Sequence, residues 1–215
     1  MHFEILIEDQ SGKKLLDNLI PKIIGKNDTF KVNAYRGIGH LPAKSDLSHI
    51  NNIRTQTLLN NLPRLINGYA KSWQAYKAVL FIVCDLDDKC LVEFKNQLMT
   101  VWKSCENKPT TRFCIAIEEG EAWLLGDFNA IKSAYPKAKD SVLRSYKNDS
   151  ICGTWKLLAD AIYKGGIAAL RKKNFPTIGM EKCEWSENIS QYMDVNNNLS
   201  PSFVYFKGKL LELVS

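Results

Sequence analysis

The sequence has few of the features that mark membrane, secreted or zinc-binding proteins. No apolar run approaches the roughly 18 residues that a membrane-spanning helix needs. The N-terminus leads directly into a strand-like segment and lacks the pattern of a signal peptide. The six cysteines include no Cys-x-x-Cys pair, which argues against a zinc site and a disulfide framework. We therefore expect a cytoplasmic protein with reduced cysteines and no membrane partner.

The composition is that of an ordinary globular protein, but its charge is unevenly distributed. The chain has 215 residues, of which 45% are hydrophobic and 24% charged, so we expect one domain or a domain with an appendage. Ten Lys or Arg residues and three Asp residues lie between Ile131 and Lys173, against a net charge of +6 for the whole chain. This basic segment indicates either a polyanionic ligand or simply a positive surface.

Strand and helix patterns alternate over the first 130 residues. Strands are expected at His2–Glu8, Phe30–Tyr35, Ala78–Val83 and Thr111–Ile117, and helices at Lys13–Ile24, Ile53–Trp73 and Lys89–Cys105. Such alternation predicts an α/β fold with a mostly parallel four-stranded sheet flanked by helices. We expect residues 1–130 to form this core, with an acidic metal site, and residues 131–215 to form a basic, mainly helical part packed on it.

Helical patterns predominate in the C-terminal part. They cover Ile151–Ile162, Gly165–Lys173 and Glu184–Tyr192, and Phe203–Val214 is expected to be either a helix or a strand.

The central strand, Ala78–Val83, leads into a pair of acids. Its unbroken apolar run is typical of a strand buried on both faces. Side chains two residues apart on a strand point to the same side, so we expect Asp85 and Asp87 to face one point. Two such carboxylates repel each other unless a cation bridges them, and their oxygens suit Mg²⁺ or Mn²⁺. Alternatively, Asp87 or Asp88 is only the N-cap of the next helix.

Acids also follow the first and fourth predicted strands. Glu8 ends the first, whereas Glu118, Glu119 and Glu121 follow the fourth. Glu118 and Glu121 share a face if a helix starts there, although the helix dipole by itself favours acids in a first turn. Acids at three strand ends on one edge of one sheet form a candidate site.

These acids and their neighbours resemble the Toprim signature, in which a glutamate ends a first strand and Asp-x-Asp ends a later one. This signature occurs in topoisomerases, primases and nucleases of the overcoming-lysogenization-defect type. More closely, the chain resembles a group of small stand-alone Toprim-like proteins. This resemblance rests on Ile7-Glu8-Asp9, Val83-Cys84-Asp85-Leu86-Asp87, Ile117-Glu118-Glu119-Gly120-Glu121-Ala122-Trp123-Leu124-Leu125-Gly126-Asp127, and Ser200-Pro201-Ser202-Phe203 with Phe206 and Leu210.

The resemblance implies a Toprim-like fold, a Mg²⁺ or Mn²⁺ cofactor and phosphodiester chemistry. It also implies a nuclease effector of a prokaryotic antiphage system, held in check by an ABC-type ATPase partner. One departure is Gly12, where Toprim nucleases often carry a second acid. Asp9 could replace it, but we expect its side chain to point elsewhere. The departure favours one-metal over two-metal chemistry.

The leading hypothesis is therefore a metal-dependent nuclease of DNA or RNA. Asp85 and Asp87 would bind the metal, Glu8 would be the general base or a further ligand, and Glu121 would complete the outer shell. In the metal-free protein we expect the neighbouring acids to raise the pKa of Glu8. The residues expected to hold the nucleic acid are Arg36, Lys156, Lys164, Arg171, Lys172 and Lys173.

Two alternatives remain open. Gly12 favours a non-catalytic Toprim-fold subunit that binds nucleic acid or the partner ATPase. A phosphatase of the haloacid-dehalogenase type also uses Asp-x-Asp, but after the first strand of its core and followed by Thr or Val. Here the pair follows the third predicted strand, and Asp88 and Lys89 come next. The sequence leaves the substrate and the oligomeric state open, a homo-oligomer included.

Overall fold

The protein is built on a small parallel sheet. The computed structural model describes residues 1–42, 56–150 and 153–214. Its strands are β1 (His2–Ile7), β2 (Thr29–Ala34), β3 (Ala78–Asp85) and β4 (Thr111–Ala116). They form one four-stranded sheet in the order β2-β1-β3-β4, and every pair is parallel. The α/β fold with a parallel sheet is therefore confirmed.

Helices cover both faces of the sheet. In the N-terminal part they are α1 (Gln10–Leu19), α2 (Leu62–Ser72) and α3 (Leu91–Ser104). The remaining helices are α4 (Glu121–Leu125), α5 (Phe128–Ala134), α6 (Asp140–Ser145), α7 (Thr154–Ile162), α8 (Gly166–Leu170), α9 (Phe175–Ser190) and α10 (Pro201–Leu211). The mainly helical character of the C-terminal part is thus confirmed.

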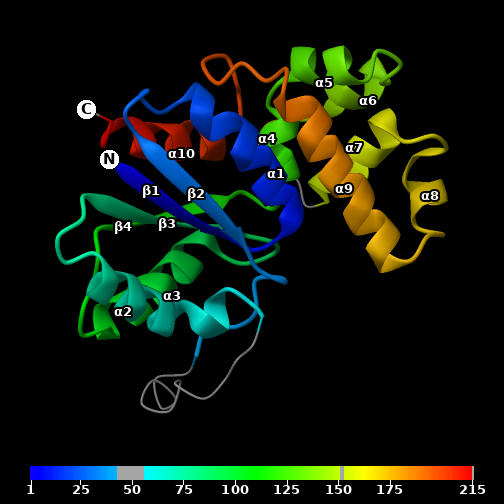
Figure 1. Cartoon of the computed structure of the whole chain (residues 1–215). Coiled ribbons are helices and arrows are strands. Elements are labelled where there is room, and N and C mark those ends of the chain that lie inside the picture. Colours follow the sequence, from blue (N-terminus) through cyan, green and yellow to red (C-terminus); the bar gives the residue numbers. More distant parts are fainter. Residues whose placement is uncertain (43–55, 151–152, 215) are drawn as a thin grey trace.

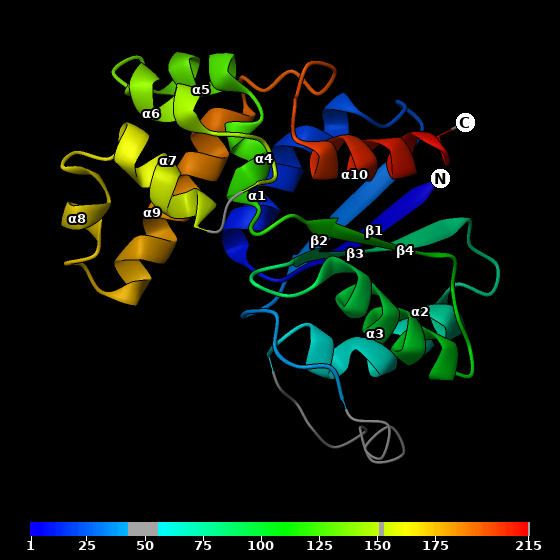
Figure 2. The ribbon, with the colours of Figure 1, turned by 180° about the vertical axis from the view of Figure 1, so that it is seen from behind.

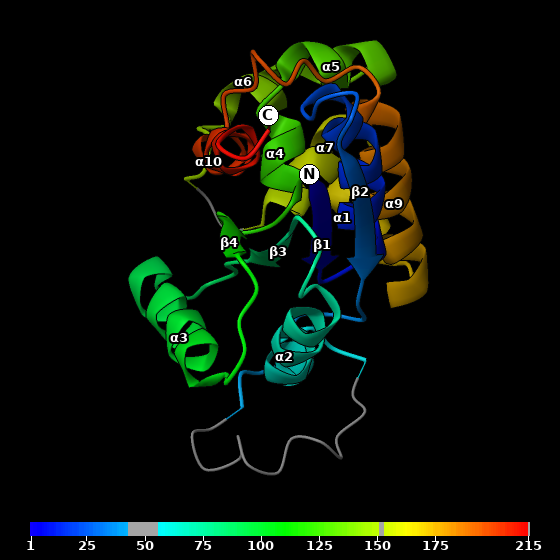
Figure 3. The same ribbon diagram turned by 60° about the vertical axis from the view of Figure 1, so that its left-hand side comes forward.

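The helices are divided unequally between the two faces. Helices α2 and α3 lie below the sheet in Figure 1, whereas α1, α10 and the other C-terminal helices lie above it or beyond its end. Figure 3 shows the same layers nearly end-on, and Figure 2 shows α10 and α3 on opposite sides of β4. The sheet is therefore the middle layer, and each face needs its own apolar side chains.

Strand alternation supplies these two apolar faces. Phe81 and Val83 of β3 belong to the core shared with α1, α4, α9 and α10, whereas Leu80, Ile82 and Cys84 belong to the core under α2 and α3. All five are at most 2% exposed, as expected for a strand buried on both faces. The core above the sheet draws residues from before and after the predicted boundary at residue 130, which falls within α5.

Prolines shift two helix boundaries from the predicted positions. The helix predicted at Lys13–Ile24 ends before Pro21, which lies in a 3-10 turn at Ile20–Lys22. Proline lacks the N–H that would continue an α-helix. Pro63 instead lies in the first turn of α2, where that N–H has no partner to lose. The predicted start of this helix at Ile53 lies outside the described residues.

The C-terminal part also differs in detail. The sequence pattern did not predict α5 or α6, and it placed only the second half of α9, as Glu184–Tyr192. The segment Phe203–Val214, expected to be a helix or a strand, is mostly the helix α10. The predicted helix start at Ile151 lies outside the described residues, as does Cys152.

The described cysteines, Cys84, Cys90, Cys105, Cys114 and Cys183, are all free thiols. Among the described residues, no helix has the length and apolar character needed to cross a membrane.

Candidate functional site

The carboxyl ends of β1 and β3 bring two predicted site residues together. These strands pair in parallel, with Ile7 beside Val83, so Glu8 and Asp85 leave the sheet at the same edge. The backbone N–H of Asp85 donates a hydrogen bond to Glu8 Oε2 at 3.3 Å. Within the described residues, no hydrogen bond or ion pair to the Asp85 carboxylate is formed. The two acids are therefore neighbours, as the sequence predicted.

Glu121 joins this pair from β4. The chain turns after β4, and Glu121 becomes the first residue of α4, where it is only 2% exposed. The carboxyl-bearing residues Glu8, Asp9, Asp85 and Glu121 line one small cavity. Its free volume of about 10 Å³ admits a single water-sized particle. Three strand ends thus contribute acids to one pocket, which we call the acid pocket.

Asp9 is a member of the pocket that the sequence analysis placed wrongly. Its side chain was expected to point elsewhere, but Asp9 lines the pocket while acting as the N-cap of α1, where its Oδ1 accepts the Gly12 N–H at 2.7 Å. A Cβ on Gly12 would lie 2.9 Å from Ile7 Cγ1 and 3.2 Å from Asp9 Oδ1. A larger residue at position 12 would therefore require the Ile7 side chain to move, and the Asp9 carboxylate already lies beside this position.

Lys182 places a positive charge beside a pocket acid, and no sequence motif predicted it. It lies on α9, and its Nζ is 3.2 Å from Glu121 Oε1, with the lysine side chain 18% exposed and the glutamate side chain 3% exposed. Ser186, one turn later on the same helix, lines the pocket. The C-terminal part of the chain therefore contributes to the site directly.

Burial and the crowding of like charges raise the pKa values of the pocket acids. Burial, then the charge of Asp9, raises the pKa of Glu8 to about 7, although the Asp85 N–H and Lys182 oppose the shift. Burial also raises the pKa of Glu121 to about 7, against the pull of Lys182. Burial, followed by Glu8, raises the pKa of Asp85 well above its ordinary value. The expected rise at Glu8 is confirmed, but desolvation contributes more to it than the neighbouring charges do.

The surrounding acids act on Lys182 in the opposite sense. Burial by itself would lower the pKa of Lys182, but Glu121, Glu119, Asp9 and Asp85 outweigh it and raise that pKa above its ordinary value. The ammonium therefore stays charged, and it is paired with Glu121, one of the acids of the pocket.

Asp87 does not follow the expected geometry. The strand ends at Asp85, and Asp87 adopts a left-handed conformation with φ of 53°, so strand alternation no longer fixes its direction. Its carboxylate pairs with Lys89 Nζ at 2.7 Å, is 45% exposed and does not line the acid pocket. The alternative was also wrong, because the N-cap of α3 is Cys90 and no side chain caps that helix.

Glu118 and Glu119 have a structural role instead. Glu118 precedes α4 in a left-handed conformation, so it shares no helix face with Glu121. Its carboxylate accepts the backbone N–H groups of Gly153 and Thr154, the latter at 3.0 Å, and Glu119 accepts the N–H of Trp155 at 3.3 Å. Both acids thus satisfy the free N–H groups at the start of α7.

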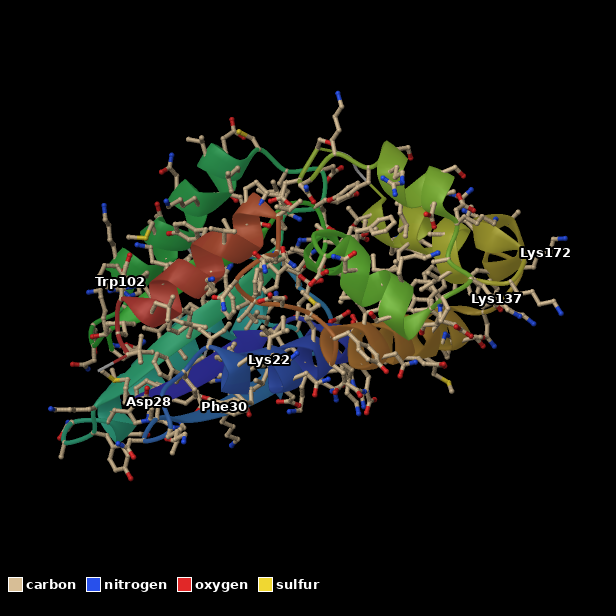
Figure 4. The ribbon with its side chains drawn as sticks, turned by 90° about the horizontal axis from the view of Figure 1, so that it is seen from above. Lys22, Asp28, Phe30, Trp102, Lys137 and Lys172 are labelled. Atoms are coloured by element: carbon tan, nitrogen blue, oxygen red, sulfur yellow. The ribbon has the colours of Figure 1, made fainter. Side chains whose placement is uncertain are left out.

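The predicted nucleic-acid contacts are exposed but lie on different elements. Arg36 follows β2, Lys156 is on α7, Lys164 precedes α8, and Arg171 to Lys173 follow α8. Helices α7 to α9 lie beyond the carboxyl ends of the strands (Figure 1). Figure 4 shows Lys172 at the end of the molecule opposite Asp28, with Lys137 near it. The predicted basic segment thus forms an outer end of the helical part.

The donor chemistry suits a hard divalent cation, although the present arrangement does not converge on one. Within the described residues, no group of three or more His, Cys, Asp or Glu side chains is arranged to hold a metal ion. Asp9 caps α1 and Glu121 pairs with Lys182, which leaves Asp85 and Glu8 as the residues that would hold the ion. Carboxylate oxygens are the ligands that Mg²⁺ and Mn²⁺ prefer.

Comparisons with protein-family models, with curated proteins and with solved structures find no match to this chain. The Toprim resemblance therefore stays a prediction.

Proposed function

We propose that the chain is a Mg²⁺- or Mn²⁺-dependent nuclease of Toprim type that hydrolyses phosphodiester bonds in DNA or RNA. The observation that carries this proposal is the Asp85 carboxylate. It has no partner among the described residues, lies beside Glu8 in a cavity of one-particle size, and is difficult to ionise there. A divalent cation at this point would remove that penalty.

The chain's own residues can be assigned roles. The bound metal would supply the Lewis acid that polarises the scissile phosphate. Asp85 and Glu8 would hold the metal, and Glu121, already paired with Lys182, would support them from outside. The pKa of about 7 suits Glu8 to accepting a proton from the attacking water near neutral pH. Lys156, Lys164, Arg171, Lys172 and Lys173 would bind the phosphate backbone without taking part in chemistry.

The biological setting implied by the resemblance is part of the same proposal. The protein would be a cytoplasmic effector of an antiphage system, regulated by an ABC-type ATPase. Gene neighbourhood tests this setting directly.

The test of the chemistry is cleavage of plasmid DNA and total RNA by purified protein with Mg²⁺, with Mn²⁺ and with chelator. We expect metal-dependent cleavage that Asp85→Asn abolishes, whereas Asp140→Asn, on the exposed first turn of α6, leaves it intact. Asp87→Asn separates two arrangements. If Asp87→Asn loses as much cleavage activity as Asp85→Asn, Asp87 lies within reach of the metal. If it retains cleavage, the metal is bound by the acid pocket without Asp87. Wild-type cleavage by Asp85→Asn would refute the proposal.

A second candidate is a non-catalytic subunit that binds nucleic acid or the partner ATPase. The ion pair between Lys182 and Glu121 favours it, because the pocket is partly neutralised without a metal. This candidate predicts nucleic-acid binding that is unaffected by chelator, together with no cleavage of either substrate under any metal condition.

A further inference from the structure

We propose that Lys182 serves as the second cation of the acid pocket and limits the pocket to one divalent ion. This inference rests on the proposed function, since it concerns the metal content of the same site. It assigns to α9, and so to the C-terminal part of the chain, a direct role in setting the chemistry of the core.

The position of Lys182 is fixed by the way α9 lies along α1. Lys14 on α1 and Glu187 on α9 pair at 2.9 Å, but both side chains are about half exposed, so this pair adds little to the register of the two helices. Further along, Asn18 Nδ2 donates to Ser190 Oγ at 2.8 Å, and Lys22 Nζ donates to the Ser190 carbonyl, also at 2.8 Å. These contacts hold α9 in register with α1 on the C-terminal side of Lys182. The lysine is thus held against Glu121, a pocket acid, with its side chain 18% exposed, unlike a surface lysine that samples many rotamers.

The charge balance of the pocket then allows for one divalent ion. Glu8, Asp9, Asp85 and Glu121 are four negative charges when ionised, and Lys182 is one positive charge. One divalent ion would leave the group with a net charge of minus one. A second would make it positive, with the ammonium repelling both ions in a buried place where charges are poorly screened.

Space leads to the same conclusion. The cavity admits about one water-sized particle, and the Glu121 carboxylate is already bound to the ammonium. In a two-metal site the ions lie about 3.5–4 Å apart and need ligands for both. Here the ammonium takes the ligand that a second ion would use. In the sequence, one-metal chemistry was attributed to the missing acid at Gly12. In the structure Asp9 supplies an acid beside position 12, so Lys182 is the better explanation for a site with one ion.

The experiment is calorimetric titration of Mn²⁺ into metal-free full-length protein, comparing wild type with Lys182→Met. Lys14→Met is the matched control, because Lys14 also pairs with a glutamate on the α1–α9 contact, but its partner Glu187 does not line the acid pocket, whereas Glu121, the partner of Lys182, does. We expect one Mn²⁺ per chain for wild type and for Lys14→Met. Lys182→Met should bind two, or one with affinity higher by on the order of tenfold, equivalent to about 1.4 kcal/mol.

The outcomes separate the inference from the proposed function. Two ions bound by wild type, or unchanged number and affinity in Lys182→Met, would overturn the inference alone. Absence of Mn²⁺ binding in all three proteins would overturn the proposed function as well. Binding by Lys182→Met but not by wild type would also overturn the one-ion site, and would favour the non-catalytic subunit.

Stability provides a readout that does not depend on activity. Removing the ammonium leaves Glu121 buried and unpaired, so Lys182→Met should melt below Lys14→Met in chelator. Mn²⁺ should raise the melting temperature of Lys182→Met more than that of wild type. If Lys182→Met folds only in Mn²⁺, the divalent ion has replaced the ammonium, as the inference requires. Failure to fold even in Mn²⁺ would overturn it.

Discussion

Glu8→Gln should stabilise the metal-free protein at neutral and alkaline pH. The substitution keeps the size of the side chain and an oxygen that can accept the Asp85 N–H, but it removes a carboxylate that is costly to ionise. Because folding raises the pKa of Glu8 to about 7, the folded state holds this proton more tightly than the unfolded state does. The stability that comes from Glu8 is therefore present at acid pH and is lost as the pH rises towards and through 7.

The size of the effect follows from the two pKa values. A shift from 4.5 to about 7, at 1.36 kcal/mol per pKa unit, gives roughly 3 kcal/mol at pH 8 and under about 1 kcal/mol at pH 5. Asp85 shares the pocket and would keep part of the penalty, so we expect Glu8→Gln to be more stable than wild type by about 2 to 3 kcal/mol at pH 8.

Urea unfolding in chelator at pH 5 and pH 8 measures this difference. Glu106→Gln, at an exposed position after α3, is the control and should show no comparable gain. Adding Mn²⁺ should reduce or reverse the advantage of Glu8→Gln at pH 8, because only wild type offers the second carboxylate to the metal. Equal stability of Glu8→Gln and wild type at pH 8 would refute the electrostatic account of the pocket.

Further predictions test the groups around the site. Glu118→Ala removes the acceptor of two buried N–H groups, so it should lower the free energy of unfolding by about 2 to 4 kcal/mol in urea titrations. Glu119→Ala, whose bonds are only partly buried, should cost less; an equal or smaller loss for Glu118→Ala would contradict its role at α7. Neutralising Arg171, Lys172 and Lys173 together should weaken nucleic-acid binding and reduce the slope of log affinity against log salt by up to about 0.9 per lost duplex-DNA phosphate contact, as fluorescence anisotropy would measure. An unchanged slope would leave these residues as ordinary surface charge.

The sheet could be predicted from the sequence because its signals are local. An unbroken apolar run such as Ala78–Val83 encodes burial on both faces, and alternation with helical patterns encodes parallel connection. The same logic placed Glu8 and Asp85 at one edge. It failed at Asp87, because periodicity holds only while the chain stays extended, and the strand ends two residues earlier.

Helix caps were less predictable because competing residues lie close together in sequence. Asp9 and Ser11 are both good N-cap residues, and only the folded backbone decides that Asp9 caps α1. Glu118 and Glu119 looked like acids in the first turn of α4, yet they bind the N–H groups at the start of α7, about 35 residues later in the chain. No local pattern encodes a partner at that distance.

The position of Lys182 in the sequence contains a signal that the motifs do not use. On α9, Ile178, Lys182, Trp185 and Ile189 recur at helical spacing, so the lysine occupies the stripe that should face the core. A lysine is rarely buried unless it is paired, so its presence on an apolar stripe predicts a buried acid on the element that the helix covers. Glu121, beside the apolar segment Ala122–Leu125, was the acid least easily explained by solvent exposure. Matching one buried cation to one buried anion would have connected α9 to the acid pocket without any motif. It would also have shown that the pocket depends on both halves of the chain, because the acids come from the sheet and the cation that balances them comes from the C-terminal helices.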